Sequence, residues 1–438
     1  MIRSLIRKCE HMNSVIGMCL MTIVSFSLNA QELYFPPSEE GEWATTPYED
    51  LNWCEDNITS LYNYLENEQT KSFIILKEGR IVLEKYFGSY TQDSLWFWFS
   101  AGKSLMATLT GITQQNESLN IENPTSNYLG AGWTSLDPSE EDNITVRNQL
   151  TMTSGLNEVI FMCTLPECLT FRANPGTRWA YHNAPYSLLR NVLESVNGMD
   201  LNMITASFIK SKIGMKGIWV NSGFNNFYTS RARDMARFGL LIQASGNWNS
   251  TPVLSDMDYF NAMISPSQNL NPSYGYLWWL NGQESYISPN SPISFAGPIA
   301  PDAPTDLITA AGSQGQYISI SPSTGLVLIR QGERNDDDLA PINFLNEIWK
   351  KVLDLECSVT SLNESVVEQI IYPIPANTIV KLKKPINNLV VYDIYGRAIP
   401  VGINVSDLFV DISELAPGVY LFKGEINGSS FSKKIYKR

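Results

Sequence analysis

The chain has 438 residues and a formal net charge of −13, with 44% hydrophobic and 17% charged residues. This composition supplies ample apolar surface for packed cores and excludes a disordered, collagen-like or coiled-coil chain. The acidic balance argues against nucleic acid as a partner, because phosphate binding needs a basic surface.

The first 30 residues have the features of a secretory signal peptide. Basic residues lie at the start, an apolar stretch covers 15–26, and Leu28-Asn29-Ala30 resembles a cleavage site. An N-terminal membrane anchor is the alternative. No apolar run of 18 residues occurs further along the chain, so no internal membrane span is expected.

Export permits disulfides, and four cysteines follow the signal segment: Cys54, Cys163, Cys168 and Cys357. Four cysteines allow three connectivities. Cys163 and Cys168 can close a short loop on themselves, and Cys54 would then pair with Cys357. A zinc site needs more ligands than this set and His182 provide, so no metal is expected.

We expect residues 45–355 to form one α+β domain. Its predicted helices and strands are, in order, helices at 51–66, 99–112, 231–242 and 342–355, and strands at 72–76, 81–86, 275–280, 317–321 and 326–330. A hairpin first, helices in the middle, and strands with a helix last predict an antiparallel sheet assembled from both ends of the domain. Helices would flank this sheet and form a helical subdomain.

Ser100-Ala101-Gly102-Lys103 places a hydroxyl and an amine three residues apart, on one face of a predicted helix. The helix N-terminus suits a developing oxyanion, and a buried lysine with a lowered pKa can deprotonate a serine. The pattern is short, so an ordinary helix start with a solvated lysine is the alternative.

A second segment, Tyr181-His182-Asn183, precedes another helical stretch. In extended backbone Tyr181 and Asn183 share one side, where the phenol could carry a proton and the amide could bind a substrate. A packed tyrosine and a turn asparagine would give the same pattern. His182 should point away from Ser100, in a structural role or at the rim of the site; otherwise the enzyme would use an unusual Ser-His mechanism.

These motifs resemble the serine β-lactamase and penicillin-binding-protein superfamily, especially its class C-like hydrolases and esterases. The resemblance also includes Thr153-Ser154-Gly155-Leu156, the stretch from Ser230 to Gly239, and the aromatic run Tyr274-Gly275-Tyr276-Leu277-Trp278-Trp279. We expect these aromatic residues to form core and cleft wall rather than a sugar platform. The resemblance implies that Ser100 is the nucleophile, that Lys103 and Tyr181 transfer protons, and that Asn183 positions the substrate.

The third motif of that superfamily, K-T-G or H-x-G, is expected at Ser313-Gln314-Gly315. Gly315 would allow close approach, and the N–H groups of Gln316 and Ser100 would form the oxyanion hole. Ser313 replaces the usual Lys or His, so one cation is missing where β-lactam carboxylates dock. An arginine such as Arg231 or Arg330 could restore it.

The resemblance thus implies a secreted serine hydrolase that acts through an acyl-enzyme on a small ester, amide or peptide, without a cofactor. The alternatives are a DD-peptidase, a β-lactamase, or a catalytically silent binding protein on the same scaffold. The sequence fixes neither the substrate nor the oligomeric state.

Residues 366–438 carry short β-type runs separated by turns, which predict a small β-sandwich. This end resembles the C-terminal sorting domain of type IX secretion cargo. The matching pieces, in order, are Tyr372 to Asn377, Val391-Tyr392-Asp393 with Gly396, Asp411 to Leu415, Pro417 to Tyr420, and Lys433-Lys434-Ile435. The resemblance implies the type IX machinery as a partner and a secreted or cell-surface location, reached through the periplasm and outer membrane. An accessory binding module is the alternative.

Overall fold

The computed structural model describes residues 33–38, 41–160, 163–289, 291–334, 338–357, 371–404, 408–426 and 429–438. The predicted signal peptide, residues 1–30, lies outside this part of the chain. No helix among the described residues is both long enough and apolar enough to cross a bilayer.

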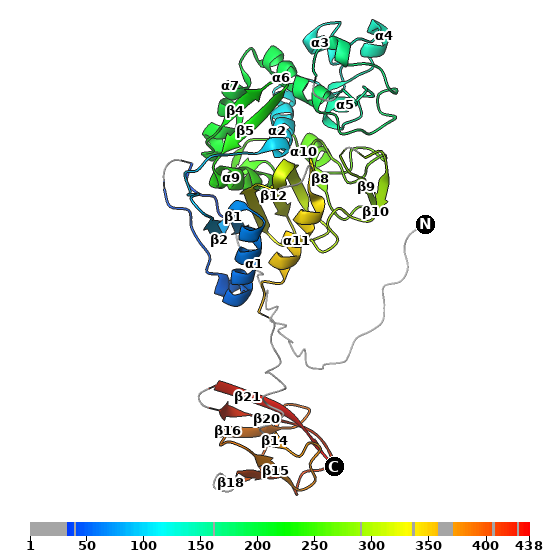
Figure 1. The fold of residues 1–438 in the computed structure, drawn as a ribbon. Helices are drawn as coiled ribbons and strands as arrows, with labels where there is room; N and C mark the ends of the chain where they lie inside the picture. The colour runs from blue at the N-terminus through cyan, green and yellow to red at the C-terminus, as the bar shows by residue number, and fades with distance from the viewer. Residues whose placement is uncertain are drawn as a thin grey trace, which may run out of the picture.

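A six-stranded antiparallel sheet forms the centre of the larger unit (Figure 1). Its strands lie in the order β2-β1-β13-β12-β11-β8, and their bounds are β1 Thr70–Lys77, β2 Arg80–Tyr86, β8 Trp279–Leu280, β11 Ile308–Gly312, β12 Gln316–Ser321 and β13 Leu326–Gly332. The N-terminal hairpin β1-β2 pairs through β1 with β13, near the other end of the unit. The predicted α+β fold, with a sheet assembled from both ends, is therefore confirmed.

Helices cover both faces of this sheet (Figure 1). The helices α1 (Glu55–Asn67) and α11 (Ile342–Leu353) lie on one face, and α2 (Gly102–Gln115) and α9 (Ala232–Gln243) lie on the other. Successive residues of β12 point to opposite sides of the sheet. Ser319 accepts a hydrogen bond from Trp349 of α11, whereas Ile318 lies against Gly239 of α9.

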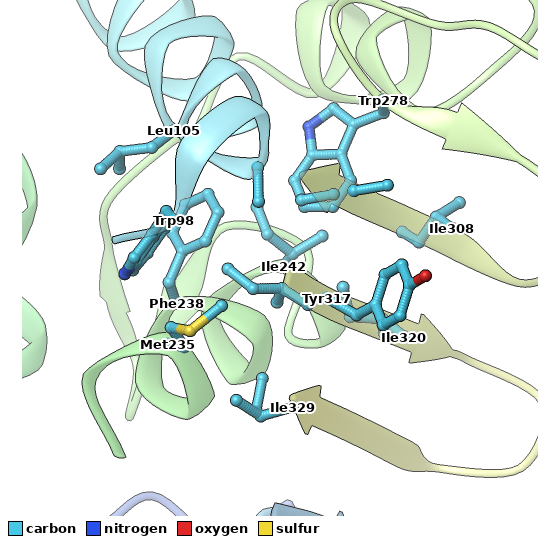
Figure 2. Close-up of a cluster of buried hydrophobic side chains, with 14 of the residues drawn as sticks. Trp98, Leu105, Met235, Phe238, Ile242, Trp278, Ile308, Tyr317, Ile320 and Ile329 are labelled. Atoms are coloured by element: carbon cyan, nitrogen blue, oxygen red, sulfur yellow. The ribbon is translucent and has the colours of Figure 1, made fainter. Parts of the chain in front are cut away.

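Gly239 lets α9 approach the sheet closely. A Cβ at this position would lie 2.6 Å from Val327 and 3.0 Å from Ile318. Figure 2 shows the resulting core between α2, α9 and the sheet, with Trp98 and Phe238 side by side. The core holds the segment that leads into α2, which positions the site described below.

The strand predicted at 275–280 is wrong over most of its length, because only Trp279–Leu280 forms β8. Leu277 adopts a left-handed φ of 59°, which extended backbone excludes. Gly275 packs so closely on the carbonyl of Met263 that a Cβ would lie 2.2 Å from that oxygen. The aromatic residues predicted there, Tyr274, Tyr276, Trp278 and Trp279, are all buried.

The helical subdomain and smaller sheets lie between β2 and β11. Its helical segments are η2 Phe99–Ala101, α3 Ser126–Leu129, α4 Pro138–Glu141, α5 Val146–Leu150, η3 Pro166–Cys168, α6 Asn183–Asn197, α7 Leu201–Thr205, η4 Ala206–Lys210, α8 Ser211–Ile213 and α10 Met257–Met263. The strands β3 (Trp96–Phe97), β5 (Asn225–Ser230) and β4 (Ile218–Ser222) form one three-stranded sheet. Two-stranded sheets are formed by β6 (Asn247–Trp248) with β7 (Thr251–Pro252), and by β9 (Ser285–Ile287) with β10 (Ser294–Ala296).

The C-terminal unit consists of two four-stranded antiparallel sheets. One contains β14 (Ile371–Tyr372), β15 (Ile379–Leu382), β19 (Phe409–Asp411) and β18 (Gly402–Asn404), and the other contains β17 (Ala398–Ile399), β16 (Asn387–Tyr392), β20 (Gly418–Ile426) and β21 (Ser429–Lys437). Its apolar core, which includes Val380, Val391 and Phe422, is separate from that of the larger unit. This is the β-sandwich expected from the alternating sequence pattern.

Both disulfides expected from the cysteine spacing are present. Cys54 and Cys357 are joined across 303 residues with a Cα–Cα distance of 4.9 Å, and Cys163 pairs with Cys168. Cys54 directly precedes α1, and its N–H donates to the carbonyl of Leu355. The first bridge therefore ties the start of α1 to the segment after α11.

Candidate active site

Ser100 lies in the short helix η2, directly before α2, and is partly exposed. Two residues earlier Trp98 is fully buried, and its indole donates a hydrogen bond of 2.8 Å to Ser230. Phe99 between them has a φ of 47°, an uncommon conformation for an aromatic residue. The buried tryptophan and this turn fix Ser100 at the surface of a packed core. The positive φ of Phe99 is a local backbone strain, and strain of this kind occurs at functional sites.

Lys103 follows one helical turn later and directs its amine back to Ser100. Its Nζ lies 3.1 Å from Ser100 Oγ, and the side chain is only 4% exposed. Burial lowers the pKa of Lys103 from 10.5 to about 7, because the ammonium form loses its hydration. The amine is thus largely uncharged just above neutral pH and can accept a proton.

Tyr181 completes the group around Ser100. Its hydroxyl interacts with the Ser100 side chain, and its ring centroid lies 5.2 Å from Lys103 Nζ. Burial raises the pKa of Tyr181, and the interaction with Ser100 opposes that rise. Trp279 stacks on the ring and Tyr274 contacts it edge-on, so the phenol is held in one orientation.

The first turn of α6 supplies Asn183, as well as a residue that sequence reasoning missed, Tyr186. The Tyr186 ring centroid lies 4.3 Å from Lys103 Nζ. Asn183 is three residues earlier and therefore on the same side of α6. Its Oδ1 is buried and has no hydrogen-bond partner among the described residues. Helical spacing from Asn183 would have pointed to Tyr186.

His182 has different neighbours from Tyr181 and Asn183. The charged groups that act on it are Glu158 and Arg178, which form an ion pair with each other, and a backbone contact comes from Ile160. Burial lowers the pKa of His182 to about 4, so the imidazole is neutral at physiological pH. These contacts agree with the expected structural role.

The residue of the third motif region that packs against the Ser100 backbone is Gly312, the last residue of β11, and not Gly315. A Cβ on Gly312 would lie 2.4 Å from the Trp98 carbonyl and 3.2 Å from the Ser100 nitrogen, so only glycine fits. A Cβ on Gly315 would instead meet Arg330 and Phe344. The close approach therefore occurs three residues earlier than the sequence predicted.

Ser313, Gln314 and Gly315 form the turn η5, which connects β11 to β12. Gln316 pairs with Gly312 in the ladder between these strands. Its side chain donates to the carbonyls of Ser313 and Gly332 and accepts from the Gly332 N–H. Gln316 thus ties the turn to β13, and its side chain does not line the site.

Neither arginine that could have replaced the missing cation is free to do so. Arg330 is fully buried and donates to the carbonyls of Gln314 and Gly315, which supports the turn. Arg231 is paired with Asp234 at 2.9 Å and with Asp93 at 3.7 Å. Both guanidinium groups are therefore engaged by protein partners and do not supply the missing cation.

A hydroxyl, a largely uncharged amine and a phenol converge at the start of a buried helix, beside the end of a sheet strand. This arrangement can activate the hydroxyl for attack on a carbonyl group, and the fold and site define a serine hydrolase. The chain belongs to the beta-lactamase family, whose family model matches residues 66–338.

A second family model, the secretion system C-terminal sorting domain, matches residues 370–438. The protein is therefore cargo of type IX secretion and is delivered to the cell surface or the extracellular space. This match confirms the identity predicted for the C-terminal sandwich.

Solved structures with the same fold have low sequence identity. A Bacillus anthracis protein described as a 6-aminohexanoate-dimer hydrolase is 16% identical, with a TM-score of 0.57 over 77% of this chain and 91% of its own. A Bacteroides dorei protein described as a beta-lactamase is 17% identical, with a TM-score of 0.53 over 69% and 98%. A family VIII carboxylesterase is 15% identical, with a TM-score of 0.51 over 67% and 96%. No curated protein sequence matches the chain.

Proposed function

We propose that the protein hydrolyses small uncharged esters, amides or peptides through an acyl-enzyme on Ser100. The observation that carries this proposal is the buried Lys103 amine 3.1 Å from Ser100 Oγ, with a pKa lowered to about 7. A serine hydroxyl becomes a good nucleophile only when a nearby base takes its proton.

Acylation begins when Ser100 Oγ attacks the substrate carbonyl carbon and its proton passes to the uncharged Lys103 amine. Tyr181 interacts with Ser100 and is held against Lys103, so it is placed to pass the proton on to the leaving group. The leaving alcohol or amine departs, and Ser100 carries the acyl group. Water then attacks the ester, with the same groups transferring protons in the reverse sense.

The oxyanion is proposed to bind the N–H groups of Ser100 and Ser313. Gly312 is the residue in close contact with the Ser100 backbone, so the next amide along the chain belongs to Ser313. Gln316, the donor expected from sequence, is paired in the β11–β12 ladder. The start of α2 adds positive potential at this point.

The substrate is proposed to lack a carboxylate at the position where β-lactams carry one. Ala310 lies two residues before Gly312, on the same side of β11, and occupies the place of the family's usual lysine or histidine. Arg231 and Arg330 are held by other partners. The carboxylesterase and the 6-aminohexanoate-dimer hydrolase among the similar structures support an ester or amide substrate.

Covalent labelling tests the proposed nucleophile. Intact-mass analysis after a fluorophosphonate probe should show one adduct on the parent chain and none on Ser100→Ala. The matched control is Ser94→Ala, at a serine six residues before Ser100 whose hydroxyl bonds to Thr91; this variant should label like the parent. An adduct that persists on Ser100→Ala would discard Ser100 as the nucleophile.

Substrate panels separate the alternatives. We expect p-nitrophenyl ester turnover to exceed turnover of a penicillin or of acyl-D-Ala-D-Ala. The reverse order would favour a β-lactamase or a DD-peptidase. A catalytically silent binding protein would give no burst with any activated ester.

A further inference from the structure

The outer face of the three-stranded sheet β3-β5-β4 is largely apolar, with the polar pair Ser222 and Asn225 at its turn end. Phe97 and Ile218 both pair with Thr229, and Val220 pairs with Phe227. Residues directly opposite one another in antiparallel strands project from the same face. These five residues, Phe97, Ile218, Val220, Phe227 and Thr229, are called the apolar face below.

The apolar face is open to solvent. Ile218 is 51% exposed, Val220 38% and Phe97 37%. The other side of the same sheet is buried, because Trp219 and Tyr228 pack against Gly102 at the start of α2. An antiparallel sheet with one buried face usually presents polar residues on the other, so exposed apolar residues here indicate a binding surface.

This surface is continuous with the proposed nucleophile. The Phe99 ring lies 5.8 Å from the Phe97 ring and 5.6 Å from the Phe227 ring, measured between centroids. Phe99 directly precedes Ser100 in the chain. A group that extends from a carbonyl at Ser100 can therefore pass over Phe99 onto the apolar face.

One polar atom on the apolar face also indicates a ligand. Thr229 is only 9% exposed, and its Oγ1 has no hydrogen-bond partner among the described residues. A buried hydroxyl without a partner is unfavourable, and a bound molecule with one polar atom along an apolar chain would satisfy it.

We propose that the apolar face binds an aliphatic or aromatic substituent of the substrate, so that the enzyme prefers esters with such a group over acetate esters. This inference rests on the proposed function, because the acyl-enzyme at Ser100 fixes where the substrate carbonyl lies. It adds the class of substrate. The bound substituent contacts Phe97, Val220 and Phe227, and Thr229 hydrogen-bonds a polar atom within it.

The test is the ratio of kcat/KM for an eight-carbon ester to that for a two-carbon ester. Two series are measured, one varying the acyl chain on p-nitrophenol and one varying the alcohol of an acetate ester. In whichever series the parent prefers the long chain, Phe227→Ser and Val220→Ser should each reduce the ratio by about tenfold. The series that responds identifies which end of the ester carries the substituent.

Leu353→Ser is the matched control, because Leu353 is 43% exposed at the end of α11, on the other side of the main sheet. It should leave both ratios at the parent value. Absence of a long-chain preference in both series, or an equal effect of Leu353→Ser, would overturn the inference.

An equilibrium measurement separates this inference from the proposed function. Octanamide binding to Ser100→Ala, followed by calorimetry, should weaken about tenfold when Phe227→Ser is added. If fluorophosphonate labelling fails but this binding difference is found, the proposed chemistry is wrong and the apolar surface stands. If labelling succeeds and the two proteins bind octanamide equally, the apolar face does not bind substrate.

Discussion

Lys103 shows how one residue can serve activity at the expense of stability. It is buried among apolar and aromatic groups, with Tyr181 and Tyr186 rings against its amine. These rings favour the ammonium form, but the loss of hydration outweighs them and the pKa falls to about 7. A solvated lysine would be charged at neutral pH and could not act as a base.

We expect kcat/KM for an activated ester to rise about tenfold per pH unit below pH 7 and to level off above it, because only the uncharged Lys103 accepts the serine proton. Stopped-flow acylation from pH 5 to 9 measures this profile. His182, whose pKa is lowered to about 4, cannot supply this inflection. A flat profile across pH 6 to 8 would contradict the assignment of Lys103 as the base.

Lys103→Met should abolish turnover and raise stability. The unfolded chain keeps the ordinary lysine pKa of 10.5, so it binds more protons than the folded chain between pH 7 and 10.5. Folding stability of the parent therefore rises with pH in that window, and the full penalty, about 5 kcal/mol, is present below pH 7.

Thermal unfolding of both chains from pH 6.5 to 9 measures this effect. The methionine variant should melt roughly 5 °C or more above the parent at pH 6.5, with a difference that shrinks as the pH rises. A difference that does not change with pH would mean that the ammonium form is not penalised by burial.

At the scale of elements, the end of β11 determines the geometry of the site. Gly312 brings the strand against the Trp98 carbonyl and the Ser100 nitrogen, and the turn after it is supported by Arg330. The position of β11 should affect activity, because the Ser100 and Ser313 amides proposed for the oxyanion hole lie on either side of this contact.

Gly312→Ala should reduce kcat/KM by about a hundredfold, because the added Cβ would lie 2.4 Å from a backbone oxygen and must displace β11 or η2. Gly102→Ala is the matched control, since its Cβ would lie 3.4 Å from Trp219, an ordinary contact. Ester kinetics on both variants measure the contrast. Equal activities would mean that the spacing between β11 and Ser100 is not critical.

Sequence patterns identified the long elements and the linear motifs of the site. The helices at 99–112 and 231–242 were predicted to within a few residues of α2 and α9, because their apolar periodicity is strong. Strand β11, with sequence Ile308-Thr309-Ala310-Ala311-Gly312, was not predicted because its small side chains carry no alternating signal. Without β11, the third motif was placed at Gly315 instead of Gly312.

Tertiary contacts explain the other differences. Arg330 and Arg231 resemble candidate ligand-binding cations in the sequence, and only folding shows that carbonyls and carboxylates already bind them. The spacing between Ser100 and Lys103 is local, so the sequence could predict that they meet. Tyr181 is distant in sequence, and the resemblance to the β-lactamase superfamily was needed to place it beside them.

At the scale of the whole molecule, the catalytic unit is closed by a covalent bond between its two ends. Cys54 and Cys357 flank α1 and α11, which pack on the same face of the main sheet, and 303 residues separate them. A bridge across so long a loop restricts the unfolded chain strongly, whereas Cys163–Cys168 closes a loop of only five. An exported protein benefits from the added stability of such a bridge, because it must remain folded without cytoplasmic chaperones.

Replacing Cys54 and Cys357 by serine should lower the free energy of unfolding by about 6 kcal/mol, whereas replacing Cys163 and Cys168 should cost about 2 kcal/mol, according to the loop-entropy relation. Urea unfolding of the two double variants, with the parent before and after reduction, measures both values. Since neither bridge includes a residue of the proposed catalytic group, ester turnover of the folded variants at 25 °C should stay near the parent value. The two bridges differ most in loop length, so the loop-entropy relation requires unequal losses of stability. Equal losses would show that the bridges act through local native contacts instead.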